Sequence, residues 1–217
     1  MTGLFITFEG IDGCGKSTQA ALLAARLRAD GVPFVHTWEP GGSEVGKILR
    51  EVFLHRAELE FAVQTEVLLM GAGRAEHVAR LIRPALERGE TVICERYIDS
   101  TTAYQGYGSD GGEELLRQIR AVNTFATGGL EPDITFLLDL DPQEAAKRRR
   151  GRVDRIESKD LEYHRRVREG YRRIAREHPG RVVLIDASAP ADVVHAQILE
   201  RLFALGRPRR RSGGGEA

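Results

Sequence analysis

The stretch that decides how this chain folds is Gly10-Ile11-Asp12-Gly13-Cys14-Gly15-Lys16-Ser17. It has the pattern glycine, four residues, glycine, lysine and serine, which is typical of a phosphate-binding loop. The apolar run 4–8 before it predicts a buried strand, and residues 18–27 after it predict a helix with one apolar face. An ordinary glycine-rich turn is the alternative. It is disfavoured because the pattern and its context agree, so the sequence predicts binding of a nucleoside triphosphate.

Each part of this loop has a chemical reason to bind phosphate. Glycines let backbone N–H groups converge on an anion, and the N-terminus of the following helix adds the positive end of its dipole. Lys16 is expected to reach the β- and γ-phosphates of ATP, and the Ser17 hydroxyl is expected to bind Mg²⁺. The predicted ATP-binding residues are Gly10, Ile11, Asp12, Gly13, Cys14, Gly15, Lys16, Ser17 and Thr18.

Length and composition indicate one ordinary globular domain. The chain has 217 residues, and its 32 Lys and Arg residues equal its 32 Asp and Glu residues. This balance predicts neither a nucleic-acid partner nor a membrane partner. No signal-peptide pattern is seen at the N-terminus, and no apolar run approaches the roughly 18 residues of a membrane helix. Cys14 and Cys94 are expected to be reduced thiols, so a cytoplasmic location is expected.

Five short apolar runs predict the strands of an α/β fold. They are near-continuously apolar, as strands covered on both faces should be, and helical patterns lie between them. The runs are 3–9, 32–38, 90–95, 133–140 and 181–186. The pattern predicts a three-layer sandwich, with a parallel sheet between two layers of helices. The domain is expected to span 1–206, and the Arg-rich, then Gly-rich tail 207–217 is expected to be disordered.

Charged residues follow the third predicted strand directly. Ligands of parallel sheets lie beyond the carboxyl ends of the strands, so Glu95 and Arg96 stand where a ligand belongs. Glu95 is expected to hold a Mg²⁺-bound water or to orient Ser17, and Arg96 to clamp a phosphate. A structural Glu–Arg pair is the alternative. Residues 100–106 add hydroxyl and amide groups of the kind that read a base or sugar.

Arginines elsewhere are open to two interpretations on chemistry alone. The densest charge, 147–157, predicts either a mobile lid over phosphates, hinged at Gly151, or a solvated face. Residues 60–88 predict a long helix with a break near Gly71 and Gly73. Arg74, which follows these glycines, is by itself structural or solvated, and Arg50 by itself is a solvated arginine.

Four motifs in order resemble the thymidylate kinase family over about 3–205. They are 8–19, then 39–42 with the sequence Glu-Pro-Gly-Gly, then 95–106, which holds Glu95-Arg96-Tyr97 and Ala103-Tyr104-Gln105-Gly106, and then Asp154-Arg155-Ile156-Glu157. The resemblance implies a P-loop kinase with a five-stranded parallel sheet and a short arginine-rich lid at about 147–157. It also implies a homodimer that makes dTDP from dTMP, with ATP as co-substrate and Mg²⁺ as cofactor. Another nucleoside or nucleotide kinase, or a non-catalytic P-loop switch, remains the alternative.

The resemblance also assigns roles to residues. Asp12 would contact the 3′-hydroxyl of the acceptor, Arg96 would bridge the two phosphates, and Tyr104 would crowd the 2′ position. Pro40 would follow a cis peptide bond. The implied catalytic residues are Lys16, Arg96, Arg148, Arg150 and Asp12. The implied acceptor-binding residues are Asp12, Pro40, Arg50, Met70, Arg74, Arg96, Thr101, Tyr104, Gln105 and Glu157. Metal would be held by Ser17 and, through water, by Glu95.

Three positions depart from the family pattern. Met70 stands where the family commonly has an aromatic residue that stacks on thymine, and a methionine stacks less well. Gly71 stands where bulkier residues are common, and Trp38 where many bacterial relatives have arginine. These departures concern the base preference and the affinity for the acceptor, and they leave the phosphate-binding residues unchanged.

Overall fold

The five predicted apolar runs form one sheet in the computed structural model, which describes residues 3–56, 58–109, 111–149 and 154–205. Every strand pairs in parallel with its neighbours. The strands are β1 (Phe5–Glu9), β2 (Phe34–Trp38), β3 (Thr91–Glu95), β4 (Ile134–Asp139) and β5 (Val182–Asp186). Each lies inside its predicted range and is one or two residues shorter. The predicted parallel sheet is therefore confirmed.

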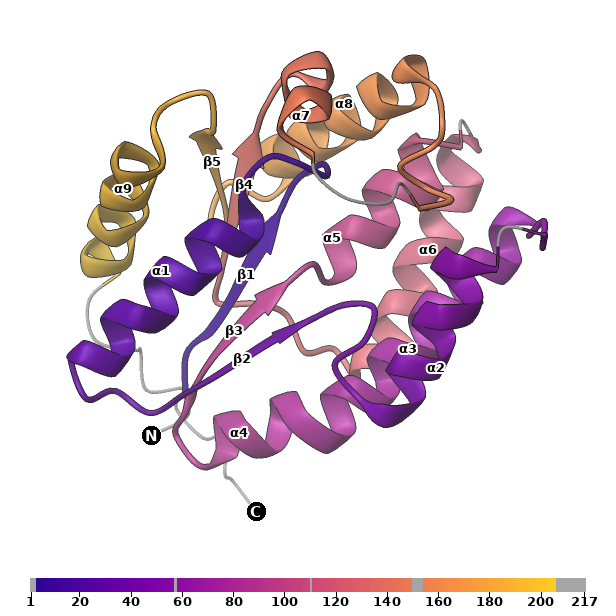
Figure 1. The fold of residues 1–217 in the computed structure, drawn as a ribbon. Coiled ribbons are helices and arrows are strands. Elements are labelled where there is room, and N and C mark those ends of the chain that lie inside the picture. Colours follow the sequence, from indigo (N-terminus) through magenta and orange to yellow (C-terminus); the bar gives the residue numbers. More distant parts are fainter. Residues whose placement is uncertain (1–2, 57, 110, 150–153, 206–217) are drawn as a thin grey trace.

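The strand order is β2-β3-β1-β4-β5, which puts β1 at the centre (Figure 1). All five residues of β1 are buried, as a near-continuous apolar run between two helical layers requires. Its one buried hydroxyl, on Thr7, forms a hydrogen bond of 2.7 Å with Thr135 Oγ1 of β4, so this polar group is satisfied. The glycine-rich loop consequently leaves β1 in the middle of the carboxyl edge of the sheet.

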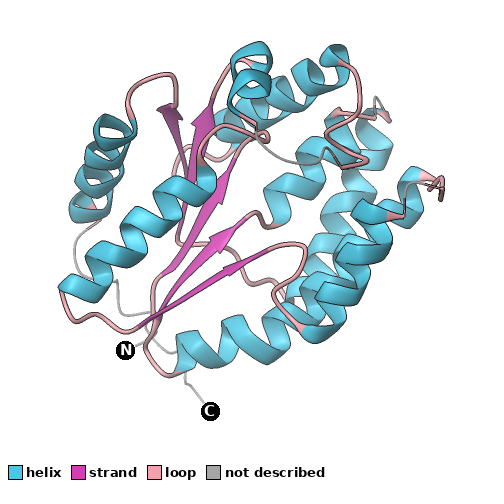
Figure 2. Cartoon of the chain, viewed as in Figure 1, coloured by secondary structure: helices cyan, strands magenta, loops and turns pink. Residues whose placement is uncertain are grey.

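Helices cover both faces of the sheet (Figures 1 and 2). On one face, α1 (Lys16–Ala29) packs on β1, β2 and β3, and α9 (Ala191–Ala204) packs on β5 and α1. On the other face, α4 (Arg83–Glu87) packs on β3, and α8 (Leu161–Glu177) packs on β4 and β5. None of the helices in the described ranges is both long and apolar enough to cross a membrane.

The remaining helical segments connect these strands and helices. They are α2 (Glu44–Arg50), the π-helical η1 (Glu51–His55), α3 (Val63–His77), the π-helical η2 (Val78–Ile82), α5 (Ile98–Thr101), the π-helical η3 (Thr102–Tyr107), α6 (Gly112–Thr127) and α7 (Pro142–Arg148). α3 packs between α2 and α6, and α8 packs along η3 (Figure 1). These contacts place η1, α3 and η3 around a common space beside the glycine-rich loop.

The break predicted near Gly71 and Gly73 is wrong, because helical structure continues from Val63 to Glu87 through α3, η2 and α4. The glycines serve helix packing instead. A Cβ on Gly71 would lie 2.8 Å from Val122 Cγ1 of α6, closer than side chains tolerate. On the other side, a Cβ on Gly73 would lie 3.6 Å from Leu49 Cδ1 of α2, an ordinary contact distance. The absence of a side chain at Gly71 therefore lets α3 and α6 pack closely.

The polar, arginine-rich stretch before the last strand predicts a helix from about Glu157 to Glu177, but α8 begins four residues later, at Leu161. Asp160 caps α8, because its side chain accepts a hydrogen bond of 2.7 Å from the Tyr163 backbone N–H. Asp154 Oδ1 accepts backbone bonds of 2.8 Å from both Ile156 and Glu157, so the residues before α8 form a turn rather than a helix.

Part of the predicted lid and the whole predicted tail cannot be compared with the structure. Within about 147–157, the structure describes 147–149 and 154–157. Arg150, Gly151 and Arg152 lie outside the described residues, as does the segment 207–217.

Candidate active site

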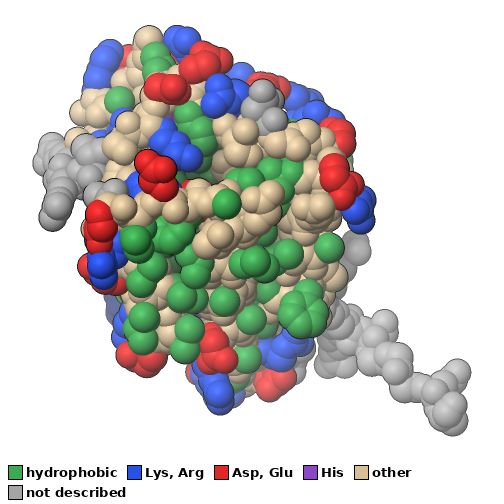
Figure 3. All heavy atoms as spheres, turned by 90° about the vertical axis from the view of Figure 1, so that its right-hand side faces the viewer, with side chains coloured by type: hydrophobic (Ala, Val, Ile, Leu, Met, Phe, Trp, Pro, Cys, Tyr) green, Lys and Arg blue, Asp and Glu red, His purple; other side chains and the backbone are tan. Residues whose placement is uncertain are grey.

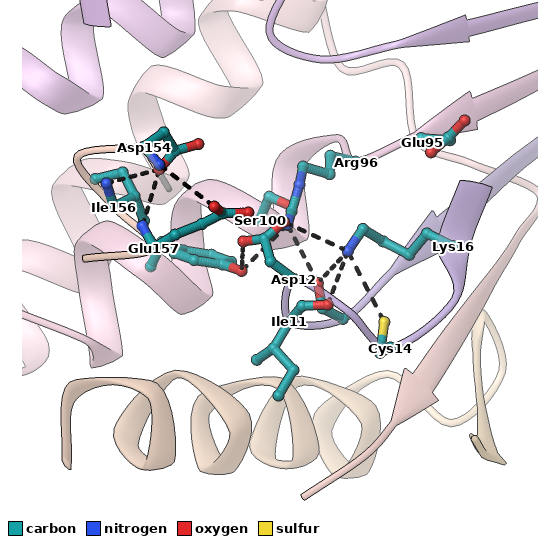
Figure 4. Close-up of polar contacts among 12 residues, drawn as sticks. Ile11, Asp12, Cys14, Lys16, Glu95, Arg96, Ser100, Asp154, Ile156 and Glu157 are labelled. Carbon is teal, nitrogen blue, oxygen red and sulfur yellow. Dashed lines mark hydrogen bonds and ion pairs between the residues drawn. The ribbon is translucent and has the colours of Figure 1, made fainter. Parts of the chain in front are cut away.

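The backbone of the glycine-rich loop surrounds the ammonium group of Lys16. Gly10, Gly13 and Gly15 have φ angles of 131°, 87° and 101°, a region that other residues rarely adopt. A Cβ on Gly10 would also lie 2.5 Å from the Leu138 carbonyl oxygen of β4. The buried Lys16 donates from Nζ to the Ile11 carbonyl at 2.9 Å (Figure 4). It also donates to the Gly10 carbonyl at 3.0 Å. An ammonium group and the N-terminus of α1 therefore meet at the loop, as anion binding requires.

Asp12 and Arg96 form an ion pair above this loop. Arg96 Nη2 lies 2.5 Å from Asp12 Oδ1 (Figure 4). The Tyr104 hydroxyl donates to Asp12 Oδ2 at 2.9 Å. Burial raises the pKa of Asp12, but the positive charges of Arg96 and Lys16 outweigh burial and hold this pKa well below its usual range. Asp12 therefore stays ionised at neutral pH and acts as a hydrogen-bond acceptor, not as an acid.

Arg96 itself is held in one orientation by further contacts. Its Nη1 donates to the Gly10 carbonyl and to Ser100 Oγ, both at 3.2 Å. The guanidinium carbon of Arg96 also lies 5.0 Å from the centre of the Tyr104 ring. The residue also has φ 68°, which is unusual for a side chain of this size. A strained backbone and several hydrogen bonds together fix one planar guanidinium beside the loop.

Glu9, at the end of β1, binds residues that surround Arg96, and the sequence analysis gave it no role. It is fully buried and accepts from the Tyr97 backbone N–H (2.7 Å), Ser100 Oγ (2.6 Å) and the Tyr171 hydroxyl (2.9 Å). Burial raises the pKa of this carboxyl group. A carboxylate that ends an apolar strand directly before a phosphate loop is the signal that would have identified it.

Ser17 and Glu95 lie together at the start of α1 and the end of β3. Ser17 Oγ donates to Glu95 Oε2 at 2.5 Å, and His36 Nε2 lies 3.0 Å from Glu95 Oε1. Burial raises the pKa of Glu95, but hydrogen bonds from His36 and Ser17 outweigh burial and lower it. Hydroxyl and carboxylate oxygens are the donors that Mg²⁺ prefers, so these residues fit a magnesium ion.

The described lid arginines lie at the edge of the site. Arg148, at the end of α7, donates to the carbonyls of Ala187 (2.8 Å) and Ser188 (3.3 Å) in the loop after β5. Arg149 donates to the Glu157 carbonyl at 3.2 Å. Burial and the negative charges of Asp12 and Asp154 raise the pKa of Glu157. A contact of Arg148 or Arg150 with a transferring phosphate stays a prediction.

Arg74 is the centre of a second, buried network. Its Nε donates to Glu39 Oε2 (2.8 Å) and its Nη1 to Asn123 Oδ1 (2.6 Å), while Nη2 reaches the Tyr97 carbonyl (2.9 Å) and Thr101 Oγ1 (3.0 Å). These bonds occupy four of its five N–H groups, and the fifth, on Nη1, is left for another acceptor. Asn123 is a partner that the sequence analysis missed, because an asparagine within a helix carries no local signal.

The turn after β2 completes this network. His77 Nδ1 lies 3.0 Å from Glu39 Oε1, and its Nε2 lies 2.8 Å from Thr37 Oγ1. The Glu39–Pro40 peptide bond is cis, as the family resemblance implied. Arg50 Nη1 donates to the Pro40 carbonyl at 2.9 Å, so this arginine faces the site rather than bulk solvent alone.

Two cavities meet at these residues. The larger, about 580 Å³, is lined by the glycine-rich loop, Glu95 and Arg148, and extends to Trp38 and to Ala187, Ala189 and Val194. The smaller, about 100 Å³, lies among η1, α3 and η3. Four charged residues line both cavities: Asp12, Glu39, Arg50 and Arg96. A group held at this junction would face two arginines and an ionised aspartate.

The structure brings most of the predicted site residues into these cavities. The larger is lined by Asp12, Gly13, Cys14, Gly15, Lys16, Ser17, Thr18, Glu95, Arg96 and Arg148. The smaller is lined by Asp12, Pro40, Arg50, Met70, Arg74, Arg96, Thr101, Tyr104 and Gln105. Gly10 and Ile11 contribute carbonyls to Lys16 instead, and Glu157 lies next to Ile156, which lines the smaller cavity.

Comparisons with known proteins agree on one family. A family model described as thymidylate kinase matches residues 8–198. A thymidylate kinase of Deinococcus radiodurans is 51% identical over 198 residues, or 90% of this chain and 94% of that protein. One of Symbiobacterium thermophilum is 48% identical over 213 residues, or 98% of each chain. The crystal structure of thymidylate kinase from Ehrlichia chaffeensis has a TM-score of 0.75 at 35% identity and covers 93% of this chain and 99% of its own.

Proposed function

This chain belongs to the thymidylate kinase family, and we propose that it transfers the γ-phosphoryl group of ATP to dTMP, giving dTDP and ADP. The observation that carries this function is the junction of two cavities at Asp12, Arg50 and Arg96. The larger cavity holds the phosphate loop and suits ATP, and the smaller suits a monophosphate acceptor. The transferring group would lie where the two cavities meet.

Phosphoryl transfer between two nucleotides depends on positioning the reacting groups and neutralising their charge more than on a general base. The acceptor phosphate is already an anion, so no proton has to leave it before it attacks. Lys16 and Arg96 would neutralise the charge that develops on the transferring oxygens. Asp12 holds the Arg96 guanidinium with a bond of 2.5 Å, so Arg96 is oriented before either nucleotide binds.

Magnesium is proposed as the cofactor of this reaction. Ser17 would bind the ion directly, and Glu95 would hold one of its waters, since the two side chains already bond to each other. When bound, Mg²⁺ would supply positive charge that neutralises the phosphate oxygens. The contribution of this chain is one hydroxyl and one carboxylate, both of which line the larger cavity.

The smaller cavity is proposed to read the acceptor. The remaining N–H group of Arg74 would donate to a carbonyl oxygen of the base, as the family resemblance implies. Tyr104, which bonds to Asp12 and receives a bond from Arg96, would stand beside the sugar. Met70 lines this cavity in the place of an aromatic ring and would contact the base through its sulfur.

A coupled ADP-release assay with ATP, Mg²⁺ and a panel of acceptors tests the proposal. The panel is dTMP, dUMP, dCMP, UMP and thymidine, and the highest kcat/KM is expected with dTMP. A preference for another acceptor would refute the proposed substrate while keeping the kinase. ADP release that no acceptor stimulates would refute the kinase and favour the ATP-binding switch.

A homodimer is proposed from an apolar face. Figure 3 shows hydrophobic side chains gathered on the face of the molecule where α2, α3 and α6 lie in Figure 1. Leu68 of α3 is 60% exposed and Phe125 of α6 is 90% exposed, and a contiguous exposed apolar patch marks an interaction surface. A second copy is the proposed occupant, since the family resemblance implies a dimer. Leu68→Glu is expected to halve the mass measured by light scattering, while Leu184→Glu, at an exposed position of β5, is expected not to.

A cytoplasmic location and the absence of a nucleic-acid partner are also proposed. Cys14 and Cys94 are buried free thiols, in agreement with the predicted reduced state and with a reducing compartment. Positive and negative residues balance, with 32 of each. Binding of the full chain to DNA at 50 mM salt that weakens with added salt would overturn the second proposal.

A further inference from the structure

Glu66 is a buried carboxylate that the reaction above does not use. It lies on α3, one turn before Met70, and only 5% of the residue is exposed. Its Oε2 accepts a hydrogen bond of 2.9 Å from Gln105 Nε2, and its Oε1 lies 2.8 Å from Arg155 Nη1. Both carboxylate oxygens are therefore engaged, one by Gln105, which lines the smaller cavity, and the other by Arg155, which lies between two residues that line it.

The bond to Glu66 decides which way the Gln105 amide points. A carboxylate accepts hydrogen bonds and donates none, so the NH₂ group of Gln105 must face it. The amide oxygen must then point away from Glu66. No described residue donates to that oxygen, although Gln105 lines the smaller cavity and is only 4% exposed. The amide oxygen thus remains available to a donor on the occupant of the cavity.

Arg155 holds the Glu66 carboxylate in place. Its guanidinium carbon lies 4.7 Å from the centre of the Phe53 ring and 4.9 Å from that of Phe61, and its Nε donates to the Phe53 carbonyl at 3.0 Å. Arg155 is thus fixed by two aromatic rings and a backbone carbonyl. A fixed guanidinium restrains the carboxylate that it pairs with, and the carboxylate in turn restrains the Gln105 amide.

We propose that Glu66 is a positioning residue that sets base selectivity, because it holds Gln105 with its amide oxygen toward the acceptor. The inference rests on the proposed function and adds a residue to it. Thymine and uracil carry an N3–H donor that an amide oxygen accepts, whereas cytosine presents an acceptor at N3. An amide held in this orientation favours dTMP over dCMP. A freely rotating amide would bind both bases, because its oxygen accepts from N3–H of thymine and its NH₂ group donates to N3 of cytosine.

The test is the ratio of kcat/KM for dTMP to kcat/KM for dCMP in Glu66→Gln. The new amide both donates and accepts, so it no longer dictates the orientation of Gln105. We expect the ratio to fall about threefold to tenfold, the worth of one net hydrogen bond. Because Glu66→Gln leaves a guanidinium unpaired, the double variant Glu66→Gln, Arg155→Met keeps the test available if the single variant does not fold.

Two further variants separate positioning from stability. Gln105→Ala is itself expected to lower the ratio, so adding Glu66→Gln to it is expected to lower the ratio no further. Asp99→Asn breaks a comparable buried pair, with Arg181 at 2.7 Å, and is expected to lower the melting temperature without changing the ratio. An unchanged ratio in folded Glu66→Gln, or independent effects of the two substitutions, would overturn the inference. A wild-type chain inactive on dTMP would instead overturn the proposed function, and this inference with it.

Discussion

Arg96 is the residue whose replacement tests the proposed mechanism most directly. Alanine and glycine at this position remove the same guanidinium, with its bonds to Asp12, Gly10 and Ser100. They differ in the backbone, because alanine keeps a Cβ at φ 68° and glycine does not. Comparing the two variants therefore separates the catalytic role of the side chain from the strain of the main chain.

The two effects have different expected sizes. Loss of an arginine that neutralises the transferring phosphoryl group lowers kcat/KM by about 10³-fold or more, which is about 4 kcal/mol of transition-state stabilisation. A Cβ at a left-handed φ lowers the stability of the folded alanine variant by about 1–2 kcal/mol. Glycine lowers the stability of its variant by about 0.4–1 kcal/mol, because the unfolded chain gains conformational freedom. The difference of the central values leaves Arg96→Gly more stable than Arg96→Ala by about 0.8 kcal/mol, within a range of about 0–1.6 kcal/mol.

The assays are steady-state ADP release with dTMP and urea unfolding followed by far-UV circular dichroism. Both variants are expected to be equally inactive, while the urea midpoint of Arg96→Gly is expected to be the higher one. A loss of activity smaller than tenfold in either variant would refute the proposed role of the guanidinium. A glycine variant that unfolds before the alanine variant would refute the argument from backbone strain.

Three further predictions concern pH, magnesium and nucleotide binding. The lowered pKa of Asp12 means that its contribution to stability is fully present above its ordinary pKa of 3.8 and declines below it. The gap in unfolding free energy between wild type and Asp12→Asn should thus be equal at pH 7 and pH 5 and smaller by about 1 kcal/mol at pH 3, and a gap that already shrinks at pH 5 contradicts this. Ser17→Ala should raise the Mg²⁺ concentration for half-maximal activity by about tenfold, worth one ligand contact, and an unchanged magnesium titration would exclude Ser17 as a ligand. Trp38 is the single tryptophan and lines the larger cavity, so ATP should change its fluorescence emission, and a flat titration with an active enzyme would place ATP elsewhere.

The sheet and the phosphate loop could be predicted because their signals are local. A strand covered on both faces needs a continuous apolar run, and all five runs became strands. The loop needs glycine where φ is positive, and Gly10, Gly13 and Gly15 are such positions. Helix ends were predicted less well, since a single cap decides them, as Asp160 does for α8.

The acceptor site was less predictable, because its side chains belong to distant segments. Arg74, taken alone, was predicted to be a structural or solvated arginine. Only the packing of α3 between α2 and α6 buries it and brings Glu39 and Asn123 to its nitrogens. The same packing explains the wrong break at Gly71, which is a site of close helix contact and not a helix end.

The amino-acid sequence by itself determined the strands, the phosphate loop and the family of this chain, because each of these depends on residues that are neighbours in sequence. The tertiary structure decided the strand order and the partners of the buried charges. Glu66 illustrates the difference, since it pairs with Arg155 across 89 positions and with Gln105 across 39. A buried carboxylate has to find its partners in three dimensions, and no local pattern encodes which arginine or amide packing will bring to it.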